Sequence, residues 1–240
     1  MARNDVLPEN DRTDDAVEGS GFSERTYPVE DLLGHAGEHR VPLIDADQPV
    51  VPDEATKELW READYIWDRC EDRRAFRSYV SADYLEVYKA LVALRGRLTT
   101  VLEWGSGLGV VAIMASNLGF QAYGIESEAP LVECSRMLAE KYGAEGVQLV
   151  HGTFIPREYE WSAASDATSF RSDVEAEPGY DELDMDLRDF DLVYAYPWPE
   201  EFLLFNDILR TCGREDCLFL TYDSREGIQL TRPGRENPSC

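Results

Sequence analysis

The stretch TVLEWGSGLG, residues 100–109, decides the fold of this chain. It starts as an apolar strand, reaches the acid Glu103 near the strand's end, and turns through three glycines into the apolar run 110–115. Glycines at this spacing let a backbone approach a ligand closely and present its N–H groups at the start of a helix. A carboxylate at that point repels a pyrophosphate but suits a ligand with an ammonium or sulfonium group. The stretch therefore predicts a strand, a ligand-binding turn and a helix.

Strands and helices are predicted to alternate from this stretch onward. The expected strands are 100–104, 121–125, 147–150, 191–195, 217–221 and 227–231, and the expected helices run to about 118, over about 129–142 and over about 200–209. Such alternation is typical of a doubly wound, mostly parallel Rossmann-like α/β sheet with helices on both faces. We expect six strands, or seven if a first strand comes from the N-terminal region.

Residues that could bind a ligand or take part in catalysis directly follow several of these strands. They are the glycine loop, Glu126, Thr153 and Tyr196. The carboxyl ends of parallel strands meet at one edge of the sheet, and ligands bind there near the point where the strand order reverses. We therefore expect these features to surround one binding site.

The glycine loop is open to more than one nucleotide-type interpretation. A dinucleotide fingerprint G-x-G-x-x-G needs a third glycine where Val110 stands, and that glycine comes one residue early, at Gly109. No G-K-[ST] sequence follows, which excludes a P-loop. The spacing E-x-G-x-G-x-G, formed by Glu103, Gly105, Gly107 and Gly109, resembles the first motif of class I S-adenosylmethionine-dependent methyltransferases.

This resemblance implies a site for the cofactor S-adenosyl-L-methionine. In the family, the loop wraps the methionine part of the cofactor; here its residues are Gly105, Ser106, Gly107 and Gly109. The acid that precedes the loop, here Glu103, reaches the cofactor's ammonium group directly or through water. The resemblance covers roughly residues 79–232.

Further cofactor contacts are expected at other strand ends. A carboxylate at Glu126 can accept hydrogen bonds from both ribose hydroxyls of an adenosine. Dehydrogenases use the same device, and a solvated acid that caps the next helix is a further interpretation. Thr153 stands where the family often carries an acid that meets the adenine amino group. The run 79–84 resembles a segment of protein-lysine methyltransferases that closes over the cofactor, which adds Tyr84 to the predicted site.

The fourth strand of the alternating series ends in Tyr196-Pro197-Trp198-Pro199. Its position resembles the substrate-facing motif of the family, which in amino-group methyltransferases often is Asn/Asp-Pro-Pro-Tyr. Tyr196 takes the polar position, so Tyr196, Pro197 and Trp198 are the predicted catalytic residues, with Tyr196 orienting the acceptor. A structural role for Trp198, covering the end of the sheet, is the alternative.

The chain divides into regions of different composition. The expected regions are a largely disordered or extended acidic N-terminal region (1–52), a helical N-terminal cover (53–98), a cofactor-binding methyltransferase domain (99–232) with an acidic insertion (156–189), and a flexible tail (233–240). The insertion is interpreted as a solvated loop or, alternatively, as a lid over the site. In the helical cover, Asp53 is the expected cap of a helix that runs to about Arg74, and Ser81 that of a helix that stops at Gly96.

The composition limits the partners and the setting. The net charge is −25, and such a surface repels nucleic-acid phosphates, so a protein or small-molecule methyl acceptor is favoured over nucleic acid. No apolar run approaches the length of a membrane span, and the first residues lack the apolar stretch of a secretory signal, which together predict a cytoplasmic protein. The five cysteines are scattered without C-x-x-C spacing, so neither zinc nor a disulfide framework is expected.

The sequence thus predicts an S-adenosylmethionine-dependent methyltransferase with an unidentified acceptor. Two alternatives stay open. One is an NAD(P)-dependent oxidoreductase with a Rossmann fold, against which Val110 and Glu103 argue. The other is a protein that binds the cofactor without catalysis, for which the irregular sequence 196–199 leaves room.

Overall fold

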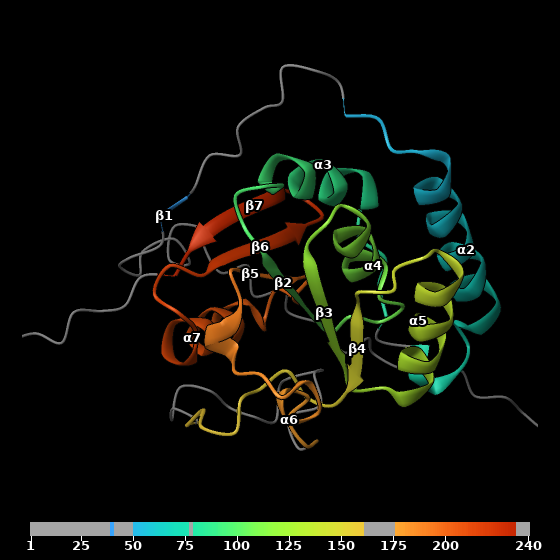
Figure 1. Cartoon of the computed structure of the whole chain (residues 1–240). Coiled ribbons are helices and arrows are strands. Elements are labelled where there is room, and N and C mark those ends of the chain that lie inside the picture. Colours follow the sequence, from blue (N-terminus) through green and yellow to red (C-terminus); the bar gives the residue numbers. More distant parts are fainter. Residues whose placement is uncertain (1–38, 41–49, 77–78, 161–175, 234–240) are drawn as a thin grey trace, which may run out of the picture. The chain divides into compact units, whose positions relative to one another are not determined.

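One sheet of seven strands organises the computed structural model, which describes residues 39–40, 50–76, 79–160 and 176–233. All of these residues belong to the compact unit Ala36–Cys240. The strands are β1 (His39–Arg40), β2 (Thr100–Trp104), β3 (Gln121–Glu126), β4 (Gln148–His151), β5 (Leu192–Ala195), β6 (Leu218–Asp223) and β7 (Gly227–Arg232). Their order across the sheet is β1-β7-β6-β5-β2-β3-β4 (Figure 1).

The strand order contains one switch point. The chain runs from β2 outward through β3 to β4, and then crosses back to place β5 on the other side of β2. Strands β4, β3, β2, β5 and β6 are parallel, whereas β7 is antiparallel to both β6 and β1. The predicted α/β class is confirmed, and the additional strand, β1, comes from the N-terminal region. The carboxyl ends of β2 and β5 flank the switch point, which is where such sheets bind ligands.

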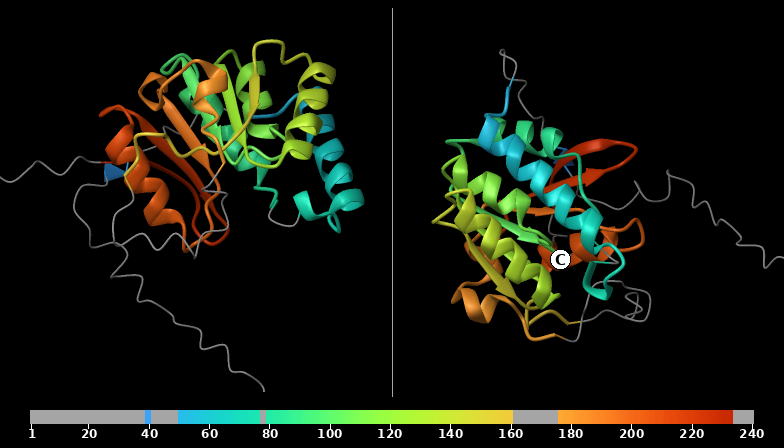
Figure 2. Two further views of the ribbon diagram at one scale, coloured as in Figure 1. Left: turned by 90° about the horizontal axis from the view of Figure 1, so that it is seen from below. Right: turned by 90° about the vertical axis from the view of Figure 1, so that its right-hand side faces the viewer.

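Helices cover both faces of this sheet (Figures 1 and 2). They are α2 (Glu54–Cys70), α3 (Tyr84–Leu94), α4 (Val110–Asn117), α5 (Ala129–Lys141), α6 (Tyr180–Leu183) and α7 (Phe202–Cys212), with 3₁₀ turns η1 (Arg74–Phe76) and η3 (Leu187–Asp189). Buried side chains of α2, α3, α4 and α5 form one core cluster, and those of α6 and α7 form another. Successive residues of β2 alternate between them, since Val101 packs in the first cluster and Leu102 in the second.

The helical cover shares its core with the sheet domain. Leu59 of α2 and Leu91 of α3 lie in the same buried cluster as the apolar residues of α4. Helix α2 lies beside α5 in both views of Figure 2. The Tyr142 hydroxyl, directly after α5, donates to the Glu62 carboxylate of α2 at 2.6 Å. Residues 53–98 are therefore built onto the domain by apolar burial.

The caps of the two cover helices differ from the prediction in one case. Asp53 caps α2 as predicted, since its side chain accepts from the Thr56 N–H at 2.8 Å. Helix α2 ends at Cys70 rather than near Arg74. The predicted cap Ser81 is wrong, because Asp83 accepts from the first N–H groups of α3. A carboxylate takes this position well, since it adds a charge that the helix dipole favours.

The acidic insertion predicted at 156–189 contributes to the core. Residues 161–175 lie outside the described part of the chain. On either side of them, Tyr159, Tyr180, Leu183 and Leu187 are all less than 10% exposed. These apolar side chains pack under β2 and β5 together with α7, which the acidic composition of the segment does not indicate.

Several predicted features fall outside the described residues. Most of the predicted extended region 1–52 and residues 234–240 of the predicted tail lie there. Among the helices that the structure describes, none is both long and apolar enough to cross a membrane.

Candidate active site

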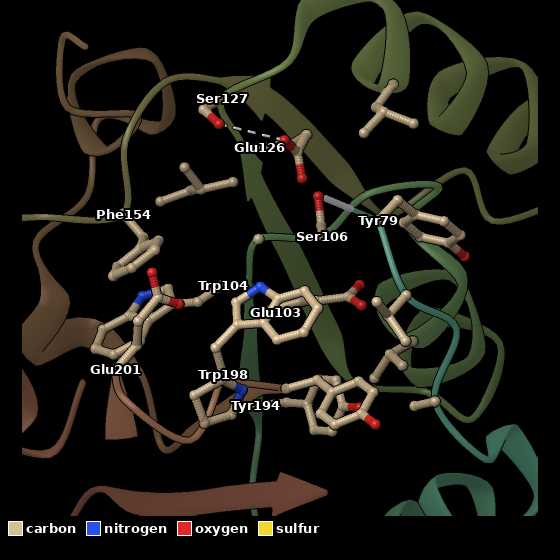
Figure 3. A pocket seen from close by; sticks show the side chains of 18 of the residues that line it. Tyr79, Glu103, Trp104, Ser106, Glu126, Ser127, Phe154, Tyr194, Trp198 and Glu201 are labelled. Carbon is tan, nitrogen blue, oxygen red and sulfur yellow. Dashed lines mark hydrogen bonds between the residues drawn. The ribbon is translucent and has the colours of Figure 1, made fainter. Parts of the chain in front are cut away.

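A cavity of about 360 Å³ opens at the switch point of the sheet. The ends of β2, β3, β4, β5 and β6 all contribute to its wall. Its volume lies in the range of roughly 300–1,000 Å³ that is typical of small-molecule sites. Figure 3 shows Glu126 and Ser127 at the upper end of this cavity, and Trp198 and Tyr194 at the lower end. We call these the Glu126 end and the Trp198 end.

The glycine loop owes its course to left-handed backbone conformations. Gly105, Gly107 and Gly109 have φ angles of 61°, 53° and 69°. At Gly107 an added Cβ would overlap the ring of Tyr79. Gly107, the second glycine of the motif, is therefore required both by its left-handed backbone and by Tyr79, which packs directly onto the loop.

Glu103 binds the first turn of α4. Its Oε2 accepts from the Ala112 N–H at 2.8 Å, and the residue is only 5% exposed. Burial raises the pKa of this carboxyl to about 8, the hydrogen bond from Ala112 opposes the rise, and the charge of Glu126 adds to it. The acid of the predicted motif thus occupies a backbone donor at the positive end of a helix.

Glu126 holds the loop from the neighbouring strand. Its Oε2 accepts from the Gly107 N–H at 2.7 Å, and its Oε1 accepts from the Glu128 N–H at 2.9 Å and the Ser127 hydroxyl at 3.4 Å (Figure 3). Burial raises the pKa of this carboxyl, although the backbone hydrogen bonds oppose the rise. Glu126 therefore both lines the cavity and fixes the glycine loop beside it.

Thr153 and Tyr84 both line the cavity, as predicted for contact residues. The Thr153 N–H donates to the Glu177 carbonyl at 2.9 Å, and its hydroxyl accepts from the Ile155 N–H at 3.3 Å. The Tyr84 hydroxyl lies 2.6 Å from the Tyr79 hydroxyl. These bonds restrict both side chains in the cavity wall.

The predicted acceptor segment forms the wall at the Trp198 end. Tyr196, Pro197 and Trp198 all line the cavity. The ring of Tyr196 packs edge-on against Tyr222, with centroids 5.1 Å apart and an interplanar angle of 77°. Glu201 follows this segment, is 1% exposed, and donates its backbone N–H to the Trp198 carbonyl at 2.8 Å.

The structure brings most of the predicted residues to one cavity. Two of the predicted site residues, Gly107 and Gly109, do not line the cavity. They shape the glycine loop behind its wall. The lining residues that sequence reasoning missed include Tyr79, Tyr194, Glu201 and Asp223. Two of them carried a usable signal. Tyr194 lies two residues before Tyr196 and so shares its side of the strand, and Asp223 ends β6 as Glu126 ends β3.

Tyr194 has a buried hydroxyl without a hydrogen-bond partner among the described residues. The residue is 3% exposed and lines the cavity, opposite Glu103 in the register of β2 and β5. Burial raises the pKa of this phenol well above its ordinary value, so it stays a hydrogen-bond donor at neutral pH. An unpaired buried hydroxyl costs roughly 1–3 kcal/mol, which a ligand group could relieve.

The charged groups of the cavity are all of one sign. Among the described lining residues there are five acids and no lysine, arginine or histidine. The acids are Glu103, Glu126, Glu128, Glu201 and Asp223. The cavity therefore favours ligands that carry positive charge.

Comparisons with known proteins give structural matches only. No protein-family model and no curated protein matches the sequence. An RNA methyltransferase from Salinibacter ruber in complex with S-adenosyl-L-homocysteine matches over 68% of this chain and 98% of its own, at 15% identity and a TM-score of 0.46. Cofactor-bound Rv0187 from MTB matches over 77% and 92%, at 14% identity and a TM-score of 0.46.

A third match is a SAM-dependent methyltransferase from Thiobacillus denitrificans, also in complex with S-adenosyl-L-homocysteine. It covers 65% of this chain and 54% of its own, at 19% identity and a TM-score of 0.38. All three TM-scores lie below 0.5.

Proposed function

We propose that this chain is an S-adenosylmethionine-dependent methyltransferase whose acceptor is a protein side chain or a small molecule rather than a nucleic acid. One observation carries the proposal. Glu103 and Glu126 occupy backbone N–H groups of α4 and the glycine loop, at Ala112 and Gly107.

In a dinucleotide site, these N–H groups would bind the pyrophosphate. Here the carboxyl groups of Glu103 and Glu126 accept hydrogen bonds from these two N–H groups. A pyrophosphate would therefore lie beside two acids and would lack two hydrogen-bond donors. A cofactor without phosphate and with net positive charge fits the same place. S-adenosylmethionine has both properties, which favours it over a nicotinamide dinucleotide.

The residues present fit the parts of this cofactor. The Oε2 of Glu126 accepts from Gly107 alone and can accept a further hydrogen bond, and Oε1 can accept one in place of the Ser127 hydroxyl at 3.4 Å, which suits the two hydroxyls of a ribose. Gly105 and Ser106 also line the cavity. Glu103 is within the same wall and suits an ammonium group, directly or through water.

The bound cofactor would supply a methyl group activated by a sulfonium. The task left to the protein is to orient the acceptor and to exclude water, and such positioning contributes roughly 7–11 kcal/mol to catalysis. Tyr196, Pro197 and Trp198 form a stiff aromatic wall suited to this task, since proline limits the backbone and the rings are large and rigid. In this proposal they hold the acceptor at the Trp198 end.

Transfer of a tritium-labelled methyl group from S-adenosylmethionine into fractionated cell lysate tests the proposal. We expect label in a protein or metabolite fraction, and a loss of transfer in Glu126→Ala. Label confined to an RNA or DNA fraction would contradict the proposed acceptor class. Cofactor binding without transfer to any fraction would support the non-catalytic alternative instead.

A titration with NADH and NADPH tests the oxidoreductase alternative, which rests on the same sheet and loop position. Saturable binding of either dinucleotide, with no binding of S-adenosylmethionine, would reverse the assignment. We expect the opposite, because the donors that a pyrophosphate needs are bonded to Glu103 and Glu126.

A further inference from the structure

Two half-buried cysteines lie on the neighbouring helices α2 and α5. Cys70 is the last residue of α2, and Cys134 lies in the first half of α5. Both are free thiols, and both pack against the buried cluster that α2, α3, α4 and α5 share. The other two described cysteines, Cys212 and Cys217, are each 1% exposed. Among the described thiols, Cys70 and Cys134 are therefore the pair that a small reagent can reach.

The contacts between α2 and α5 place these two cysteines opposite each other. At the end of α5, Lys141 and Tyr142 both contact the Glu62 carboxylate of α2. Cys70 lies eight residues after Glu62, and Cys134 lies eight residues before Tyr142. Eight helical residues span about 12 Å. Two helices that run in opposite directions from this contact therefore reach Cys70 and Cys134 at the same height.

The other end of the helix pair shows that α2 and α5 do run in opposite directions. The turn η1 follows α2, and its Cα atoms lie within 8 Å of Cα atoms of α5. Ala75 of η1 lines the same cavity as Leu131, which lies in the first turn of α5. The chain after α2 thus meets the start of α5, whereas Glu62 meets its end. Cys70 and Cys134 lie between these two contacts.

The surroundings of the Cys134 thiol agree with this placement. Burial raises the pKa of this thiol, the Cys70 thiol and Glu133 add to the rise, and Arg73 opposes it. Charge interactions weaken with distance, so Cys70 and Arg73 at the end of α2 are near neighbours of Cys134.

From this arrangement we propose that Cys70 and Cys134 form a reversible disulfide that joins the helical cover to α5. The bond would fix the end of α2 beside the part of the cavity wall that Ala75 and Leu131 form. Neither cysteine is among the described residues that line the cavity, so the proposal does not depend on the proposed methyltransferase function. In a reducing compartment, such bonds are transient and serve as redox sensors.

The oxidant in this step is a low-molecular-weight disulfide such as oxidised glutathione. The Cys70 thiolate attacks one of its sulfur atoms, the sulfur–sulfur bond breaks, and one glutathione leaves as a thiolate. The Cys134 thiolate then attacks the Cys70 sulfur and releases the second glutathione. Cys134 reacts second because its raised pKa leaves less of the nucleophilic thiolate. The two protein thiols lose two electrons to the oxidant, and their two protons pass through water to the released glutathione thiolates.

The test exposes the full, reduced chain to oxidised glutathione and examines its peptides by mass spectrometry. We expect a peptide that contains Cys70 to be joined to one that contains Cys134 within a single chain, and dithiothreitol to separate them. Because the bond closes a loop of about 65 residues, the Tm of the oxidised chain should be higher by roughly 5–15 °C.

Single variants locate the effect. Cys70→Ser and Cys134→Ser should each lose both the joined peptides and the rise in Tm, and Cys134→Ser should retain one glutathione on Cys70. Cys240→Ser is the matched control, because it removes a thiol and keeps both proposed partners. This variant should form the bond and gain stability as the native chain does.

Three results would overturn the proposal. The first is the absence of joined peptides after exposure to an excess of oxidised glutathione. The second is a bond that pairs Cys70 or Cys134 with another cysteine or links two chains. The third is an unchanged or lower Tm after the bond has formed, because it would show that the fold must distort to bring the two thiols together.

Discussion

The Glu126 end and the Trp198 end of the cavity are built in different ways. At the Glu126 end, carboxylate oxygens bond backbone N–H groups at 2.7–2.9 Å, and the loop turns on glycines with left-handed φ angles. At the Trp198 end, rings from β5 and the following turn face acids from separate segments, and the Tyr194 hydroxyl has no partner among the described residues. One end is formed mainly by backbone, and the other by side chains.

This difference fits two functions, binding of the proposed cofactor at the Glu126 end and binding of the acceptor at the Trp198 end. Backbone groups fixed by short hydrogen bonds change little on binding, so they suit one invariable ligand part, such as the proposed cofactor. A buried hydroxyl without a hydrogen-bond partner can form a new hydrogen bond with a bound ligand, so side chains of this kind can contribute to ligand recognition. Substitutions at one end should therefore leave the other end unchanged.

Gly107→Ala should disable the Glu126 end. The left-handed backbone costs roughly 1–2 kcal/mol for any other residue, and the new Cβ would also overlap the Tyr79 ring. We expect the affinity for S-adenosyl-L-homocysteine to fall about 30-fold or more, as measured by calorimetry. Gly143→Ala is the matched control, since Gly143 also has positive φ but an added Cβ there meets nothing within 4 Å. It should lose stability and keep cofactor affinity; equal affinity losses in both variants would contradict the account.

Glu126→Gln should weaken cofactor binding by about tenfold. Hydrogen bonds to a charged acceptor are roughly twice as strong as neutral ones, and the amide can also no longer accept at both of its ends. The dissociation constant of S-adenosyl-L-homocysteine gives the effect directly. A variant that binds the cofactor as tightly as the native chain would show that Glu126 serves only the loop.

Glu103→Gln should flatten the dependence of stability on pH. In the folded chain this carboxyl has a pKa of about 8, whereas its ordinary value is 4.5. Between these values the unfolded state binds fewer protons than the folded state, so the free energy of unfolding falls as pH rises through this window. Thermal unfolding at pH 5 to 8.5 should therefore show a smaller decline in Tm for Glu103→Gln than for the native chain. An unchanged slope would mean that Glu103 is ionised in the fold.

Tyr194→Phe should stabilise the free protein slightly. Removal of an unpaired buried hydroxyl relieves its desolvation cost, so we expect a gain of about 1 kcal/mol in the free energy of unfolding. The same variant should leave the affinity for S-adenosyl-L-homocysteine unchanged. Chemical denaturation measures the first effect, and calorimetry measures the second. Destabilisation instead would indicate that the hydroxyl has a structural role.

The Glu126 end could be predicted from sequence because it depends on spacing. The positions of Glu103, the glycines and Glu126 relative to predicted strand ends place them around one site, and the structure places them around one cavity or in the loop behind it. Asp83 replaced the predicted cap Ser81 because two nearby polar residues could each serve, and local sequence does not rank them.

The Trp198 end was only partly predictable, because it depends on contacts between distant segments. Residues 196–198 were recognised from their place after a strand, but Tyr79 and Asp223 join them in the cavity wall only in the folded chain. The acidic insertion hid core residues in the same way. Tyr180 bonds Trp104 and the Phe154 carbonyl from far along the sequence, at 2.9 and 2.8 Å. Composition averages over such a segment and misses the few apolar side chains that are buried.

Two acids of the protein, Glu103 and Glu126, occupy the N–H donors that a pyrophosphate would need. Parallel calorimetric titrations of the full chain with S-adenosyl-L-homocysteine and with NADH measure whether they exclude a dinucleotide. We expect saturable binding of S-adenosyl-L-homocysteine and no detectable binding of NADH under the same conditions. Saturable binding of NADH, with none of S-adenosyl-L-homocysteine, would contradict this expectation.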